Sequence, residues 1–166
     1  MKLLIFSLLI LFSNTSSSSK IQKIENSLVS MQWLIGSWTN EDNTYKQTYQ
    51  WRLNRTQILT IIEKKNAGKW ENIIEANFIY HPIKERLLAY ATASTPELSF
   101  YELMVMKTDN GLELYSESIN SINRKVSSVS YWHNISADEF AVFPIDVTKD
   151  PVLPWLYGAW HKVNSN

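Results

Sequence analysis

Apolar and polar residues recur along the chain with two different periods. Between residues 20 and 34 the apolar side chains recur at spacings of three and four, at Ile21, Ile24, Leu28 and Met31. This period places them on one stripe and predicts a short helix. The helical pattern breaks at Gly36, and from Trp38 onward the period changes to two. A period of two is typical of strands with one buried and one exposed face.

The remainder of the chain divides into about nine short strands separated by turn signals. The expected strands are residues 45–53, 57–64, 70–80, 86–92, 98–106, 112–118, 126–133, 140–147 and 155–163. The strongest turn signals are Asn66-Ala67-Gly68 and Asp109-Asn110-Gly111, because glycine and asparagine tolerate the positive φ of hairpin turns. No segment between the strands is long enough for a crossover helix, so we expect antiparallel pairing.

These elements predict an all-β domain over residues 20–166. We expect a single antiparallel up-and-down β-barrel of about 8–10 strands with a short N-terminal capping helix. A meander of this many strands would leave two edges exposed, and closure into a barrel removes both of them. A β-sandwich is the alternative architecture.

The first 19 residues have the pattern of a signal peptide. A short positive start, Met1-Lys2, precedes an apolar run over residues 3–12 and small polar residues over 14–19. The apolar run is far shorter than the roughly 20 residues of a membrane-spanning helix, although a retained anchor is an alternative. We therefore expect an exported protein, periplasmic or secreted, with no transmembrane segment in its mature part.

Composition narrows the function classes. The chain has 16 basic and 16 acidic residues and no run of Lys and Arg, which argues against a nucleic-acid partner. The absence of Cys excludes disulfides and thiolate chemistry. The histidines His81, His133 and His161 lie on separate segments without the spacing of metal ligands. We expect no metal and no cofactor, with a haem held by one histidine as the alternative.

A resemblance to a known class enters at Leu34-Ile35-Gly36-Ser37-Trp38. A short helix that runs into Gly-x-Trp at the first strand resembles the opening of lipocalins and fatty-acid-binding proteins. The turn Tyr80-His81-Pro82 also looks like the Tyr-Asp-Pro turn of uncharacterised lipocalin-like families of exported bacterial proteins. The resemblance implies a calycin-type barrel.

The resemblance also implies roles for two residues. Gly36 would let the chain turn tightly into the first strand, and Trp38 would plug the closed end of the barrel. Lipocalins place an Arg from the last strand against this Trp, whereas the last strand here offers only Lys162 and His161. The match is therefore to the broad class and not to a lipocalin proper.

The expected ligand site is the barrel interior. Barrels of about eight strands can hold one small ligand, in a pocket that is largely apolar with a few polar groups. The candidate interior residues are Trp51, Phe78, Arg86, Tyr90, Phe100, Glu102, Tyr115 and Trp132. Alternatively, these side chains simply fill the barrel.

Glu102 and Arg86 are the charged members of this set. Glu102 shares a strand face with Phe100 and Met104, and a carboxylate on an apolar face is costly unless it is paired or protonated. Arg86 lies on the neighbouring strand, so the two could meet inside the barrel. Since residues 98–106 are apolar on both faces, the alternative is that Glu102 points outward.

The leading functional expectation is a non-catalytic exported protein that binds a small apolar or amphipathic molecule. The chain carries no Gly-x-Ser-x-Gly, His-Glu-x-x-His or phosphate-loop motif. Two alternatives stay open. One is a barrel enzyme, an isomerase or hydrolase, that uses an interior carboxylate; the other is a structural or interaction module with a filled barrel.

Overall fold

The computed structural model describes residues 27–95, 98–119, 125–145 and 153–163. The expected signal peptide and the first part of the expected helix lie outside the described residues. The described strands are β1 (Gly36–Asn40), β2 (Tyr45–Arg52), β3 (Gln57–Asn66), β4 (Lys69–His81), β5 (Arg86–Thr95), β6 (Leu98–Thr108), β7 (Gly111–Ile119), β8 (Lys125–Asn134), β9 (Glu139–Pro144) and β10 (Gly158–Lys162).

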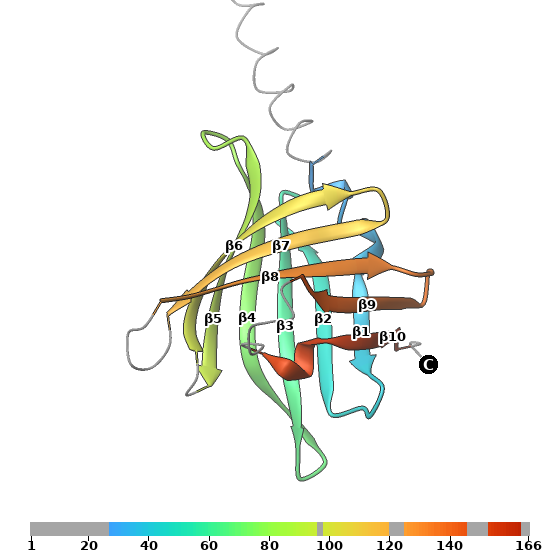
Figure 1. Ribbon diagram of the computed structural model, residues 1–166. Coiled ribbons are helices and arrows are strands. Elements are labelled where there is room, and N and C mark those ends of the chain that lie inside the picture. Colours follow the sequence, from blue (N-terminus) through green and yellow to red (C-terminus); the bar gives the residue numbers. More distant parts are fainter. Residues whose placement is uncertain (1–26, 96–97, 120–124, 146–152, 164–166) are drawn as a thin grey trace, which may run out of the picture.

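The strands form one closed barrel in which each strand pairs with its neighbours in sequence (Figure 1). All pairs are antiparallel, and β1 closes the barrel against β10 through the register Trp38↔Lys162. The expected all-β up-and-down barrel is therefore confirmed, and the sandwich alternative is wrong. Closure satisfies the backbone groups that two free edges would leave unpaired.

The strands differ from the expectation at both ends of the chain. Residues Gly36–Asn40, which were not among the nine expected strands, form β1, and two boundaries differ near the C-terminal end. Of the expected strand 140–147, the part up to Pro144 is a strand, β9, which begins one residue earlier at Glu139; residues 146–147 lie outside the described residues. The expected strand 155–163 begins only at Gly158, and a single 3₁₀ turn, η2 (Pro154–Leu156), precedes it. Proline at the start of a helical turn is favourable because its missing N–H would have no partner there.

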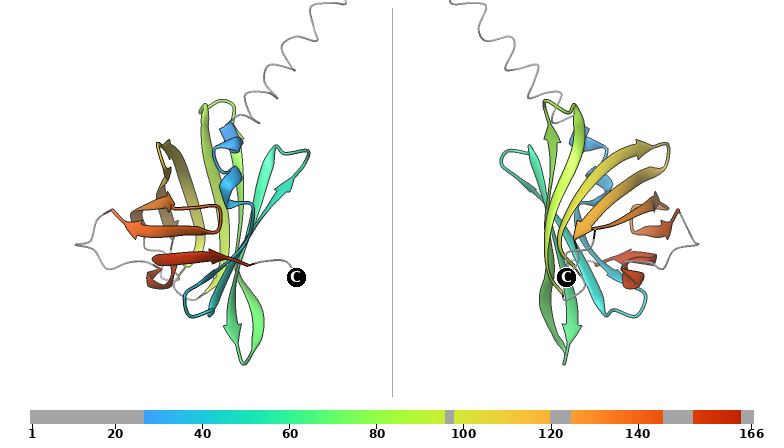
Figure 2. Two further views of the ribbon diagram at one scale, coloured as in Figure 1. Left: turned by 90° about the vertical axis from the view of Figure 1, so that its right-hand side faces the viewer. Right: turned by 60° about the vertical axis from the view of Figure 1, so that its left-hand side comes forward.

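The described part of the N-terminal helix covers one end of the barrel. Ser27–Val29 are helical and lead into the 3₁₀ turn η1 (Gln32–Leu34). Leu28, Met31 and Leu34 are fully buried, so the apolar stripe of the sequence packs on the barrel. Figure 2 shows these turns, in blue, set against one end of the barrel wall.

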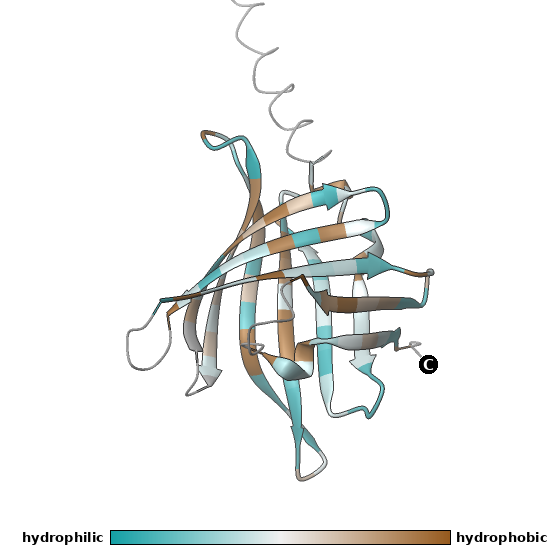
Figure 3. Cartoon of the chain, in the orientation of Figure 1, coloured by the Kyte–Doolittle hydropathy of each residue, from teal (hydrophilic) through white to brown (hydrophobic). Residues whose placement is uncertain are grey.

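Apolar and polar residues alternate along the strands (Figure 3). Because successive side chains of a strand point to opposite faces, the apolar set faces the interior. The interior at the η1 end is filled by a cluster of rings centred on Phe140. The Phe140 ring lies 4.9 Å from Trp38 in an edge contact and stacks on Trp132 at 5.7 Å and on Trp160 at 6.0 Å, measured between ring centroids. Aromatic contacts of this geometry stabilise a core beyond the area that they bury.

Candidate functional site

Trp38 occupies the end of the barrel that η1 covers. Its ring is fully buried, and its Nε1 donates a hydrogen bond to the carbonyl oxygen of Leu34 at 2.6 Å. Gly36 has a φ of +128°, and a Cβ there would lie 3.2 Å from Cε of Lys162. The glycine therefore permits both the backbone turn into β1 and the close approach of Lys162.

The turn η2 covers the interior from another side. Trp155 stacks on Tyr45 with ring centroids 4.5 Å apart and an interplanar angle of 10°. Gln32 of η1 accepts a hydrogen bond from Trp51, which lies toward the other end of the same strand, β2. The two 3₁₀ turns are thus anchored at opposite ends of one strand, and each contributes apolar side chains to the core.

Two adjoining cavities lie between the barrel wall and η2. The first, of about 70 Å³, is lined by Tyr49, Thr60, Ile62, Ile74, Ala76, Phe78, Ala91, Tyr101, Leu103, Leu114, Trp132, Leu153 and Leu156. The second, of about 60 Å³, is lined by Tyr101, Leu103, Leu114, Ser116, Ser128, Ser130, Trp132, Leu153, Leu156 and Tyr157. Six residues line both cavities, so the two adjoin.

The second cavity has the more polar wall. The hydroxyls of Ser116 and Ser128 lie 2.6 Å apart across β7 and β8, and Trp132 Nε1 donates to Ser130 Oγ at 3.0 Å. In the first cavity, Thr60 is 3% exposed, and its Oγ1 has no hydrogen-bond partner among the described residues. No Asp, Glu, Lys or Arg is buried within the described part of the chain.

Burial also changes the acidity of two tyrosines. Tyr49 lines the first cavity and donates a hydrogen bond to Oε1 of Gln47. Desolvation raises the pKa of the Tyr49 phenol well above its ordinary value, because the charged phenolate is disfavoured in an apolar environment. Desolvation also raises the pKa of Tyr157 in the second cavity. Both phenols therefore stay neutral at physiological pH.

Three of the eight candidate interior residues face the interior. Phe78 and Trp132 are 3% and 4% exposed and line the first cavity. Trp51 packs partly buried against the core near η1, where its Nε1 donates to Gln32 Oε1 at 3.1 Å. Trp51 therefore lies inside the barrel but away from both cavities.

The expectation that the other five point inward is wrong. Outward-facing positions of β5, β6 and β7 carry Arg86, Tyr90, Phe100, Glu102 and Tyr115. Their strand neighbours Ala89, Ala91 and Tyr101 are buried in the core instead. The physical reason is volume: rings from β2, β8, β9 and β10 already occupy the interior, so β5 contributes alanines there and larger side chains outside.

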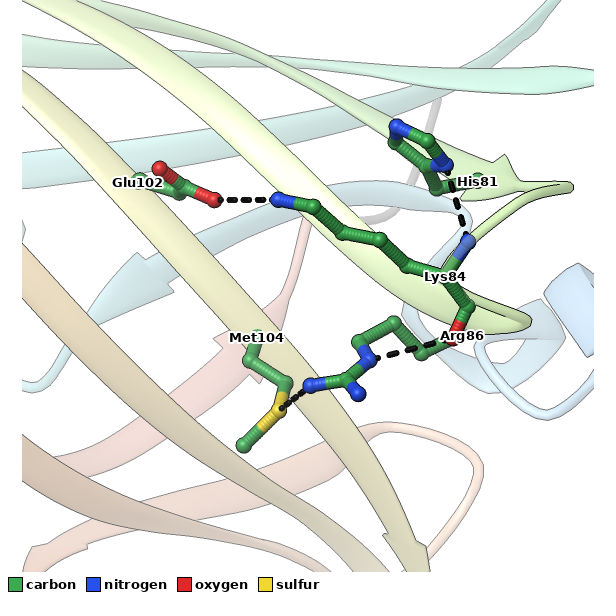
Figure 4. Close-up of polar contacts among 5 residues, drawn as sticks. All are labelled: His81, Lys84, Arg86, Glu102 and Met104. Carbon is green, nitrogen blue, oxygen red and sulfur yellow. Dashed lines mark hydrogen bonds and ion pairs between the residues drawn. The ribbon is translucent and has the colours of Figure 1, made fainter.

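Glu102 and Arg86 do not form the expected interior pair. Figure 4 shows Lys84 Nζ extended to Glu102 Oε1, at 3.3 Å, while Arg86 Nη1 donates to Met104 Sδ, also at 3.3 Å. These side chains line an open groove of about 450 Å³ on the outer wall, together with Leu88, Tyr115 and Glu117. Glu102 therefore supplies no interior carboxylate.

The small and hydroxylated cavity residues were missed by the sequence reasoning, which concentrated on aromatic and charged positions. Ala76 and Ala91 make room, and the serines of β7 and β8 supply polarity. One signal was present: alanine recurs at every second position from Ala89 to Ala93. Such a small-residue face opposite large side chains indicates the inner wall of a narrow barrel.

The described histidines do not form a cluster of metal ligands. Nδ1 of His81 accepts from the backbone N–H of Lys84 at 3.2 Å, and Nδ1 of His133 lies 3.2 Å from the hydroxyl of Tyr131. Within residues 27–95, 98–119, 125–145 and 153–163, no group of three His, Cys, Asp or Glu side chains could hold a metal ion. None of the helices in these ranges is both long and apolar enough to cross a membrane.

The described strands define the class of this protein as a closed ten-stranded up-and-down barrel, with two small adjoining cavities between its wall and η2. Comparison of the chain with protein-family models, with curated proteins and with solved structures finds no match.

Proposed function

We propose that this chain is an exported, non-catalytic protein with a lipocalin-like, calycin-type barrel that binds one small apolar or amphipathic molecule. The observation that carries the proposal is the pair of adjoining, mainly apolar cavities that lie between the barrel wall and η2. Export is supported by the sequence pattern of residues 1–19.

The size of the cavities limits the ligand. An apolar cavity of about 150 Å³ binds benzene-sized molecules. The two cavities, of about 70 and 60 Å³, together approach that size. A ligand that fills both would replace water or empty space with contacts to Ala76, Ala91 and Leu114, and burial of its apolar surface favours binding.

The test is a search for ligand in the protein as its own host makes it. Native mass spectrometry of the purified full chain should show a mass increment from a small molecule, and a panel of small lipophiles should raise the melting temperature by mass action. Protein that arrives empty and is not stabilised by any lipophile would contradict the proposal.

A matched pair of variants assigns the binding to the cavity. Ala76→Leu places a larger side chain in the first cavity and should abolish the stabilisation by lipophiles. Asn77→Leu adds an apolar side chain at the adjacent, exposed position of β4. It should leave the stabilisation by lipophiles unchanged. Equal binding by both variants would place the ligand elsewhere.

A second candidate function, an interaction module, is favoured by one observation on the outer wall. Leu88 is only 2% exposed although it faces outward, and it lines the groove together with Met104 and Tyr115. An apolar groove rimmed by charged side chains is typical of protein-binding surfaces. This function predicts that Leu88→Asp abolishes a measurable association, assayed first as self-association by analytical ultracentrifugation, while lipophiles have no effect on stability.

A further inference from the structure

The two cavities differ in chemistry although they share a wall. Beyond the shared residues, the first cavity is lined mainly by apolar side chains, among them Ile62, Ala76 and Ala91; Tyr49 and Thr60 are its polar members. Beyond the same shared residues, the second is lined by Ser116, Ser128 and Ser130 of β7 and β8 and by Tyr157. A molecule that spans both cavities therefore meets a mainly apolar wall at one end, where Thr60 carries a hydroxyl with no partner among the described residues, and several hydroxyl groups at the other.

Ser130 has hydrogen-bonding capacity left for a ligand. A serine hydroxyl has one proton to donate and two lone pairs. Ser130 Oγ accepts from Trp132 Nε1 at 3.0 Å, and no acceptor for its own proton is found among the described residues. The residue is 8% exposed, and a buried polar group gains most when a ligand completes its hydrogen bonds.

The neighbouring hydroxyls are already bonded to each other. Ser116 Oγ lies 2.6 Å from Ser128 Oγ and 3.3 Å from the carbonyl oxygen of Ser128. This pair fixes the polar wall without using the proton of Ser130. Among the three serines of the polar end, Ser130 is therefore the best placed donor.

The lining also restricts the charge of the ligand. Neither cavity is lined by Asp, Glu, Lys, Arg or His. An ion placed there would lose its hydration without gaining a counter-charge, which is strongly unfavourable. The ligand is consequently expected to be neutral.

We propose that the site takes a small neutral molecule with one carbonyl or ether-type oxygen, oriented with that oxygen on the hydroxyl of Ser130 and its hydrocarbon body against Ala76 and Ala91. This inference rests on the proposed binding function and adds to it the orientation and chemical class of the ligand.

The test compares three probes of similar size with the purified full chain: cyclohexanone, methylcyclohexane and cyclohexanecarboxylate. Titration followed by NMR should give tighter binding of the ketone than of the hydrocarbon and no binding of the carboxylate. Ser130→Ala should lower the affinity for the ketone about tenfold, which corresponds to the loss of one hydrogen bond. It should leave the affinity for the hydrocarbon unchanged.

Two controls separate the outcomes. Ser127→Ala removes an exposed hydroxyl from the same strand, β8, and should alter neither affinity. If Ser130→Ala fails to fold because Trp132 Nε1 loses its acceptor, Ser130→Cys is used instead. The cysteine keeps a sulfur acceptor for Trp132 but is a weak donor. It should therefore lower the affinity for the ketone and not that for the hydrocarbon.

Equal binding of ketone and hydrocarbon, with no effect of either Ser130 variant, would overturn this inference and leave the proposed function standing. Preferential binding of the carboxylate would also overturn it. Failure of all three probes to bind would count against the binding function itself.

Discussion

The ammonium group of Lys162 lies over the indole ring of Trp38, with Nζ 5.1 Å from the ring centroid. Lys162 and Trp38 are directly paired in the register of β10 and β1, the two strands that close the barrel. The last strand thus places a lysine against the Trp38 ring. Because the Trp38 ring is fully buried, the cation also seals its face from solvent.

Removal of this cation should destabilise the barrel. Lys162→Met keeps an apolar side chain of similar length but loses the cation–π attraction, worth about 0.5–2 kcal/mol. We expect the free energy of unfolding in urea to fall by about this amount, whereas Lys162→Arg should retain it. The control is Lys65→Met, which removes an exposed ammonium 5.4 Å from the Trp70 ring. If the free energy of unfolding falls by the same small amount in both methionine variants, the Lys162 contact has no special role.

Gly111 should be the glycine least tolerant of substitution. A Cβ at Gly111 would lie 1.9 Å from the carbonyl oxygen of Trp132, so alanine forces the backbones of β7 and β8 apart. We expect Gly111→Ala to lower the free energy of unfolding by about 3 kcal/mol or more. Gly68→Ala is the control, because its φ is +83° but no atom lies within 4 Å of the added Cβ. If thermal unfolding shows that the two variants lose comparable stability, the steric explanation is contradicted.

Turn chemistry and alternation are local properties, and they predicted nine of the ten strands; β1 (Gly36–Asn40) was not among the nine. The sequence also placed Gly111 correctly beside a turn, but it could not show that this glycine is required by a strand backbone 21 positions later in the chain. That contact depends on the pairing of β7 with β8, which is a property of the whole barrel. Turn signals identified the position, whereas tertiary structure supplies the reason for the residue.

The direction of the strand faces was harder to predict. In β5, both alternating sets are apolar: Leu88 and Tyr90 face outward, and Ala89 and Ala91 face inward. Hydrophobicity favours placing the larger residues inside, but a barrel of fixed circumference limits the interior volume. For this reason the predicted aromatic and charged site shared only Phe78 and Trp132 with the observed cavity lining.

Substitution of Glu102 should leave the interior site unaffected. Glu102 and its partner Lys84 are 41% and 47% exposed at the side chain, and an ion pair at such positions contributes about 0–1 kcal/mol. We expect Glu102→Gln to bind interior lipophiles with unchanged affinity and to unfold within about 1 kcal/mol of the original chain. Isothermal titration calorimetry checks the affinity. A clear loss of lipophile binding would instead link the outer groove to the ligand.

Stability at alkaline pH should be limited by the phenol of Tyr49. Burial holds the pKa of Tyr49 well above its ordinary value, so the folded chain keeps the phenolic proton at a pH where the unfolded chain has released it. The contribution is therefore fully present below about pH 10 and is lost as the pH rises from there toward the folded-state pKa, at up to about 1.4 kcal/mol per pH unit. Tyr49→Phe should show a shallower decline between pH 9 and 11 in urea unfolding, measured by circular dichroism. It should also be less stable at neutral pH, since the hydrogen bond to Gln47 is lost. Tyr90→Phe on the outer wall controls for the loss of a phenol, and an unchanged slope in Tyr49→Phe would show that another group sets the alkaline limit.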